Sequence, residues 1–258
     1  MKKLLIIPDK DNLTASLSIA KEYNLGFEYN DFFDSDILDD ERALSEIIKE
    51  YRSYSLPEYT TVHGAFIDIN PFSSDKRIKE ISLLRINQSI EAARKIGAKA
   101  VVFHLNYNPF LNSPAYVECF TKQNIEIWGN ILKSNSDVNI YLENMFEKDP
   151  DILKQISQHL SKFENFGVCL DWAHASLSDV EPQKWAETLA RYIKHIHIND
   201  NDLISDLHLS LGDGKIDRFA FYECYKKYMN NATVLIETNS IENQKKSLEQ
   251  LKSDGVLC

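Results

Sequence analysis

The sequence predicts an α/β fold, a single closed (βα)8 TIM barrel that takes in residues 1–258 as one domain. Three observations support this prediction. The chain has 258 residues, the usual length of such a barrel. Short apolar runs alternate with helix-like segments along the whole chain. Five of the runs end in a histidine or a carboxylate, and strand ends of this fold converge on the active site. These five residues are His104, Glu143, Asp171, His197 and Glu237.

The strands are expected where apolar runs are continuous, because strands of a parallel barrel are covered on both faces. The expected strands are Lys3–Pro8, Gly26–Tyr29, Thr60–Ile67, Ala100–Leu105, Val138–Glu143, Gly167–Asp171, Lys194–Ile198 and Thr233–Glu237. An open doubly wound sheet is the structural alternative. That fold usually has a glycine-rich turn after its first strand, and no glycine follows the first run here.

The helices are expected between the strands, where apolar residues recur at helical spacing. Within Lys76–Ile96 this spacing is shown by Ile78, Ile81, Leu84, Ile90 and Ala93. Gly97 follows as a C-cap glycine would, and a proline in the first turn is typical of a helix start. The expected helices are Leu13–Tyr23, Asp40–Tyr51, Lys76–Ile96, Ala115–Lys133, one opened by Asp149-Pro150, one that starts at Pro182 and carries Trp185, Leu189 and Ile193, Arg218–Met229 and Ile241–Leu251.

The charge balance limits the choice of partners. The formal net charge is -10, whereas a protein that grips nucleic acid through its phosphates usually carries a basic surface. Nucleic acid is therefore not expected as the main partner. No apolar run approaches the length of a membrane span. The start of the chain briefly imitates a signal peptide, but its apolar run is only Leu4 to Pro8, so a first strand is expected instead.

The four cysteines are scattered without paired spacing, at Cys119, Cys169, Cys224 and Cys258. Such a pattern favours small apolar side chains and a tail thiol over a disulfide framework. A reducing, cytoplasmic location is therefore expected. The sequence leaves the oligomeric state open between a monomer and a homo-oligomer.

Further metal-capable side chains accompany the five strand ends. His63 lies in the third expected strand, His174 follows Asp171 by one turn, and Asp206 and His208 form a D-x-H pair after the seventh strand. Each alone is more often a hydrogen-bonded core residue or a solvated carboxylate. Gathered at one end of a barrel, buried carboxylates would be costly without a cation to pair them. Imidazole and carboxylate ligands together suit Zn, Mn, Fe or Co.

The segments around these residues resemble the sugar phosphate isomerase/epimerase family of xylose isomerase-like barrels, which shares its metal scaffold with endonuclease IV. The matching segments are VHGAFIDINP, VVFHLNYNP, YLENM, VCLDWAHASL, HIHINDND, DLHLSLGDGKID and LIET. The resemblance implies one to three divalent ions, Zn or Mn. It assigns the first ion to His63, His104 and Glu143, the second to Glu143, Asp171, His197 and Glu237, and the third to His174, Asp206 and His208.

The resemblance implies a sugar or sugar-phosphate isomerase or epimerase, in which Glu143 and Glu237 move a proton through an enediolate. The alternative is an endonuclease IV-like hydrolase that cleaves a phosphoester with three ions. A second alternative is a metal-binding or sugar-binding barrel without turnover. The chain departs from endonuclease IV at residues 144–148, where that enzyme has a glycine-rich stretch, and it has no recognisable DNA-inserting loop residues.

Several further residues are candidates for contact with the substrate. Gly212 and Gly214 would let backbone amides approach a phosphate or hydroxyl, or they form a plain turn. Asn144 and Asp200 directly follow strand ends and are candidates for holding the ligands in place. Four aromatic residues either stack on a sugar or cover the rim of the barrel, and these are Phe66, Tyr107, Phe110 and Trp172.

Two histidines are expected outside the metal site. His195 precedes His197 by two residues and so points to the same face of its strand, deeper in the barrel. His159 is expected at the surface, in a helix over residues 155–163.

Overall fold

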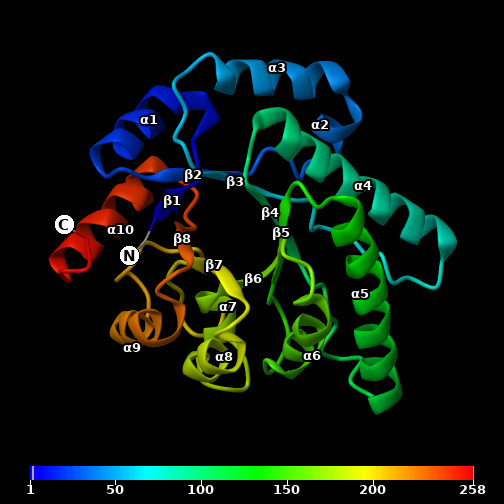
Figure 1. The fold of residues 1–258 in the computed structure, drawn as a ribbon. Coiled ribbons are helices and arrows are strands. Elements are labelled where there is room, and N and C mark those ends of the chain that lie inside the picture. The colour runs from blue at the N-terminus through cyan, green and yellow to red at the C-terminus, as the bar shows by residue number, and fades with distance from the viewer. Residues whose placement is uncertain (2, 258) are drawn as a thin grey trace.

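The chain folds into a closed barrel of eight parallel strands (Figure 1). The structure is a computed structural model that describes Met1 and residues 3–257, so the expectation for Cys258 lies outside the described residues. The strands are β1 Leu4–Ile6, β2 Gly26–Tyr29, β3 Thr60–His63, β4 Ala100–His104, β5 Asn139–Glu143, β6 Phe166–Asp171, β7 Ile193–Ile198 and β8 Thr233–Ile236. Because β1 pairs with both β2 and β8, the sheet has no edge and the open-sheet alternative is excluded.

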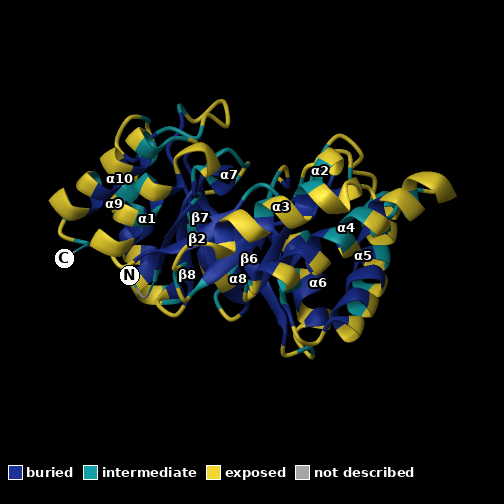
Figure 2. Ribbon diagram, turned by 90° about the horizontal axis from the view of Figure 1, so that it is seen from above, coloured by how far each residue is buried: buried dark blue, intermediate teal, exposed yellow. Residues whose placement is uncertain are grey.

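The helices form a ring outside the strands, with their buried faces turned inward and exposed faces outward (Figures 1 and 2). They are α1 Leu13–Glu22, α2 Ser35–Asp39, α3 Glu41–Arg52, α4 Lys76–Ile96, α5 Pro114–Ser134, α6 Asp151–Leu160, α7 Trp172–Ser176, α8 Pro182–Leu189, α9 Arg218–Cys224 and α10 Ile241–Ser253. Two short turns, the 3₁₀ turn η1 Lys10–Asn12 and the π turn η2 Tyr225–Met229, adjoin α1 and α9.

The ends of α4 follow the local chemistry of its sequence. The Asp75 side chain accepts the backbone N–H groups of Arg77 and Ile78, as an N-cap residue does. Gly97 closes the helix with a φ of 86°, a left-handed conformation that favours glycine. Ile90 and Ala93 face the core as the spacing predicts. The other three residues of the predicted apolar stripe, Ile78, Ile81 and Leu84, are instead exposed.

The expected third strand is too long, because β3 ends at His63 rather than at Ile67. The Gly64 N–H still donates to the Val102 carbonyl, but the Ala65 N–H donates to the Ser89 hydroxyl of α4. The backbone therefore leaves the sheet after Gly64. A Cβ on Gly64 would lie 2.2 Å from the Phe103 ring, so this close turn requires glycine.

Smaller differences occur elsewhere. Ile193 begins β7 and is not part of α8, which ends at Leu189. The helix expected over Arg218–Met229 divides into α9 and the π turn η2. The short helices α2 and α7 follow strand ends and were not expected, because a single turn carries too little periodicity to be seen in a sequence. Among the described residues, no helix has the length and apolar character needed to cross a bilayer. The three described cysteines are unpaired.

Candidate metal centre

The carboxyl ends of the strands surround a cavity of about 370 Å³. Strand register brings the sequence-predicted residues together there. His104 of β4 is the register partner of Glu143 of β5, and Asp171 of β6 is the partner of His197 of β7. The residues that line the cavity are Ile7, Asn30, Phe33, His63, Phe66, His104, Met145, His174, Asp206, His208, Glu237 and Asn239.

Two groups of side chains at the strand ends have the spacing of metal ligands, and a third group lies at the mouth of the cavity. In the first, the Nε2 atoms of His63 and His104 lie 3.2 Å apart. They lie 3.7 and 3.5 Å from Oε2 of Glu143. One ligand atom from each of the three residues lies within 4.8 Å of the other two, and all three residues are buried. This geometry fits a single ion shared by two imidazoles and a carboxylate.

The second group uses the other oxygen of Glu143. His197 Nδ1 lies 3.3 Å from Glu143 Oε1 and 3.5 Å from Glu237 Oε2. Glu143, Asp171 and His197 also fall within 4.8 Å of one another. Asp171 Oδ1 caps helix α7 through the His174 N–H, which leaves Oδ2 free. Glu143 therefore belongs to both groups.

The third group comes from loops and α7 instead of strands. Asp206 Oδ2 lies 3.3 Å from His174 Nε2 and 3.0 Å from His208 Nε2. His174 is buried, while Asp206 and His208 are partly exposed at the mouth of the cavity.

Hydrogen bonds orient the histidine rings of these groups. The Nδ1 atoms of His63, His174 and His208 lie 3.0, 2.9 and 3.2 Å from the carbonyl oxygens of Gly64, Asn144 and Glu237. A carbonyl only accepts, so each Nδ1 carries the proton and donates. The lone pair of each ring is then on Nε2, which is the atom that faces the group. His104 also presents Nε2, with its Nδ1 beside the Met145 sulfur.

The charges at the centre are unevenly distributed. Burial opposes ionisation of Glu143, but attraction to His197 and His104 outweighs it and lowers the pKa of Glu143 to about 2. Burial raises the pKa of Asp171 to about 7, assisted by Glu237 and Glu143 against the opposing effect of His174. Burial also lowers the pKa of His104 to about 3. Metal binding requires neutral imidazoles and ionised carboxylates, so a bound cation would displace the proton that burial favours on Asp171.

The donor atoms of this centre fit a bound cation. Both oxygens of Glu143, Oδ2 of Asp171, Oε2 of Glu237 and both ring nitrogens of His197 are buried without a hydrogen-bond partner among the described residues. Unpartnered buried carboxylates carry a large desolvation cost, which a divalent ion would offset.

Most of the remaining candidates for substrate contact lie outside the lining of the cavity. Asn144 is buried and exchanges two 2.9 Å hydrogen bonds with the backbone of Asp171, so it braces β6 and does not face the cavity. Gly212 and Gly214 form a turn around the Asp200 carboxylate; the Gly212 N–H donates to it, and a Cβ on Gly214 would lie 2.3 Å from it. This is the plain-turn arrangement. Trp172 is buried against Phe221, outside the cavity lining.

Of the other aromatic candidates, Phe66 alone lines the cavity, with its ring 5.0 and 4.8 Å from the rings of His63 and His104. Tyr107 is buried against Phe120, and Phe110 is 91 % exposed on a loop. His159 is exposed on α6, as expected.

The sequence did not single out several residues of the cavity, namely Asn30, Phe33, Met145 and Asn239. It also missed Glu28, a fully buried carboxylate below the cavity. Burial raises the pKa of Glu28, but the attraction of His197 and the contact with His195 Nε2 outweigh it and hold that pKa well below its ordinary value. The sequence contains one signal for Glu28, which is its position inside the expected strand Gly26–Tyr29. A charged residue in a buried strand needs a partner, so this position indicates a buried polar contact.

A further buried acid, Glu147, follows β5 and gives a stability prediction. Its Oε2 accepts the Met145 N–H at 2.7 Å and its Oε1 has no partner. Burial raises the pKa of Glu147 to about 7. The folded state therefore holds this proton more tightly than the unfolded state, and stability is lost as the pH rises from the unfolded pKa through the folded one. In metal-free protein, Glu147→Gln is expected to raise the unfolding free energy by about 2 kcal/mol at about pH 8 and by little at about pH 5.

Urea unfolding of both proteins at the two pH values tests this. Equal differences at the two pH values would contradict it, because the effect comes from the ionised carboxylate alone.

A closed parallel barrel whose strand ends hold clustered imidazoles and carboxylates defines a class of (βα)8 barrels built to hold divalent metal. The chain belongs to the xylose isomerase-like TIM barrel family, whose model matches residues 19–253. It is 30 % identical over 202 residues to an uncharacterized protein of Methanocaldococcus jannaschii, covering 74 % of this chain and 68 % of the relative.

Two further likenesses point to the two branches of the family. A probable endonuclease 4 of Ureaplasma parvum is 28 % identical over 198 residues, covering 69 % of this chain and 64 % of that protein. The crystal structure of a D-tagatose 3-epimerase-like protein superimposes with a TM-score of 0.78 at 26 % identity, covering 98 % of each chain.

Proposed function

We propose that the protein is a divalent-metal-dependent isomerase or epimerase that acts on a small sugar or sugar phosphate. One observation carries the proposal. Glu143 of β5 and Glu237, at the end of β8, approach the same nitrogen of His197 at 3.3 and 3.5 Å. Two carboxylates from separate strands at one centre suit a reaction in which one removes a proton and the other returns it.

The side chains divide this work. A divalent ion bound here would acidify the C–H beside a sugar carbonyl. Glu143 and Glu237 are the proton-transfer pair, and an enediolate is the species between the two transfers. Asp171 and His197 would hold that ion. Phe66 and Phe33, whose ring centroids are 5.1 Å apart, form an apolar wall of the cavity against which a sugar ring can lie.

The likeness to a D-tagatose 3-epimerase-like protein supports a sugar substrate. The alternative is a phosphoester hydrolase, which is favoured by the third group of His174, Asp206 and His208 and by the probable endonuclease 4 relatives. The net charge of -10 argues for a small phosphoester over DNA in that case.

Two measurements decide between these functions. Metal analysis of protein purified without chelator is expected to give about one Mn²⁺ per chain for the isomerase, whereas about three Zn²⁺ would favour the hydrolase. Incorporation of solvent deuterium into candidate ketoses then tests proton transfer directly. Exchange into at least one ketose is expected. Cleavage of a phosphoester without exchange in a broad sugar panel would reverse the assignment.

Metal removal gives a further prediction. Dialysis against a chelator is expected to lower deuterium exchange by at least about 10³-fold, because the C–H would no longer be acidified. Addition of Mn²⁺ or Zn²⁺ is expected to restore it. Circular dichroism before and after dialysis serves as the control for folding. Undiminished exchange in metal-free protein would contradict the metal dependence.

A further inference from the structure

Glu28 is a buried charged residue to which the proposed function gives no role. It comes from β2, is fully buried within the barrel, and belongs to none of the three candidate metal groups. Its Oε2 accepts a hydrogen bond from the Thr61 hydroxyl at 2.6 Å and lies 3.1 Å from His195 Nε2. Its Oε1 lies 3.0 Å from His197 Nε2. Because Oε2 already has two partners, Oε1 is the oxygen that pairs with His197, at an ion-pair distance and without the alignment of a hydrogen bond.

His197 connects this carboxylate to the cavity. Its Nε2 faces Glu28, and its Nδ1 faces Glu143 and Glu237. A neutral imidazole has one protonated nitrogen and one lone pair. A carboxylate next to Nε2 stabilises the proton there and leaves the lone pair on Nδ1. His197 thus carries its proton on Nε2. In His63, His174 and His208 the proton is on Nδ1 instead, because a backbone carbonyl accepts it there.

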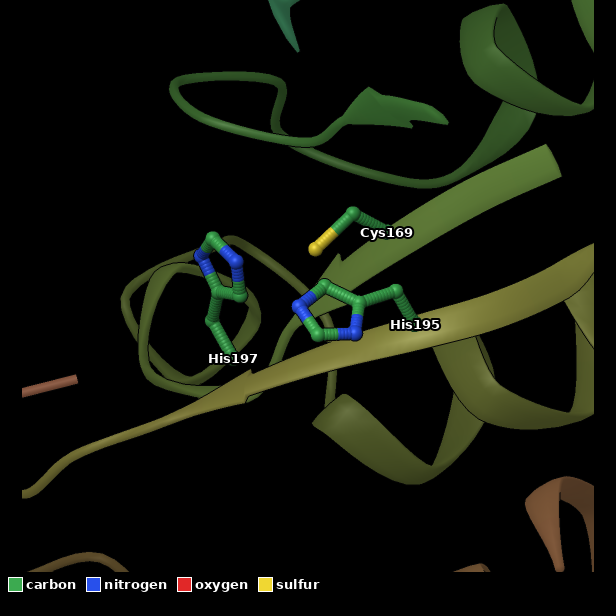
Figure 3. Close-up of side chains that lie close together, drawn as sticks. All are labelled: Cys169, His195 and His197. Atoms are coloured by element: carbon green, nitrogen blue, oxygen red, sulfur yellow. The ribbon is translucent and has the colours of Figure 1, made fainter. Parts of the chain in front are cut away.

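His195 holds Glu28 in turn. Its Nδ1 lies 2.6 Å from the Thr233 hydroxyl of β8, while its Nε2 faces Glu28. His195 and His197 project from the same strand, with Cys169 of β6 beside them (Figure 3). Their ring planes are nearly perpendicular, at 89°, with centroids 5.0 Å apart. Contacts to β3 and β7 therefore fix the carboxylate in place, and β8 fixes His195.

We propose that Glu28 is a positioning residue of the metal centre, which holds Nε2 of His197 so that this histidine binds the ion through Nδ1. The inference rests on the proposed metal centre. It extends that centre to Glu28, which lies inside the barrel and contacts His197 among the proposed ligands. A carboxylate behind a ligating imidazole fixes its tautomer and ring orientation, and its loss typically weakens metal binding by about 10–100-fold.

The same interior allows a competing arrangement. Cys169, His195 and His197 have ligand atoms within 4.8 Å of one another, so a second ion could in principle lie between them. In that arrangement the thiolate would be a ligand and the histidine nitrogens would bind metal instead of Glu28. The test therefore includes Cys169→Ser, which removes the thiol and keeps a small buried side chain.

Competition of Zn²⁺ between protein and a chromophoric chelator measures the affinity of unaltered protein, Glu28→Gln and Cys169→Ser. Glu28→Gln is expected to bind about 10–100-fold more weakly, because its amide has a single acceptor oxygen for two histidines. Cys169→Ser is expected to bind within about twofold of unaltered protein, since its thiol is not a ligand. Unchanged affinity in Glu28→Gln, or an equal loss in Cys169→Ser, would overturn the proposal. Thermal melting of the metal-free proteins separates loss of affinity from loss of fold.

A second measurement uses unaltered protein, and so does not depend on the folding of a variant. NMR of isotope-labelled histidine, with the protein loaded with an NMR-active cadmium isotope, shows which ring nitrogen couples to the metal. One histidine is expected to couple through Nδ1 and the other coordinating histidines through Nε2. Coupling through Nε2 alone would overturn the role of Glu28. Protein that takes up neither Zn²⁺ nor Cd²⁺ would instead overturn the proposed metal centre, so the two failures are distinguishable.

Discussion

Glu143→Gln is expected to lower deuterium exchange into the substrate by at least about 10³-fold, the contribution typical of a positioned acid or base. It is also expected to lower the metal content, because Glu143 is the residue shared by the first and second groups. Glu237→Gln is expected to lose exchange to a similar extent, while the shared ligand Glu143 stays in place. Metal analysis and exchange rates on the same preparations measure both effects.

The matched control is Asp137→Asn, which removes a carboxylate that is paired with Arg94 at the protein surface. Its exchange rate and metal content are expected to equal those of unaltered protein. Full exchange in either glutamate variant would show that these carboxylates do not transfer the proton, and the isomerase mechanism would then be wrong.

The second large effect concerns Asp200, which holds the loop that carries Asp206 and His208. Its buried carboxylate accepts the backbone N–H groups of Asn201, Gly212 and Ile216 at 2.9, 2.9 and 3.0 Å. Hydrogen bonds to a charged group are stronger than those between neutral groups, and their loss would leave buried N–H groups unpaired. Asp200→Ala is therefore expected to lower the unfolding free energy by about 4 kcal/mol. Urea unfolding measures this change.

Asp213→Ala is the control in the same loop. Asp213 pairs with Lys246 at the surface, and such a pair contributes less than about 1 kcal/mol. If the two variants were equally stable, Asp200 would not organise the loop. Asp200→Ala is also expected to displace Asp206 and His208, while the ligands at the strand ends keep their positions.

The fold was predictable because strand signals and helix signals alternate regularly along the chain. The strand-end residues were predictable for a similar reason. A histidine or glutamate that closes an apolar run, such as His104 or Glu143, has its direction set by the strand, and strand register then brings it to its neighbour. The C-terminal bound of α4 was predicted from Gly97 in the same local way, and the structure adds Asp75 as the cap at the other end.

The residues that the sequence missed depend on long-range packing. Glu28 lies in a four-residue strand, and its partners His195 and Thr61 are known only once the barrel closes. Gly212 and Gly214 were candidates for substrate contact because a glycine-rich turn permits two roles. The structure directs their backbone towards Asp200, which no local pattern could indicate. The contact of Trp172 with Phe221 could not be predicted for the same reason, because it depends on tertiary packing.

The third group differs from the other two in its origin, because Asp206 and His208 belong to a segment anchored at Asp200 and not to the barrel wall. Such a segment can change its length or sequence while the eight strands keep their register. A change in this segment would therefore alter the third group and leave the register of His104 with Glu143, and of Asp171 with His197, unchanged.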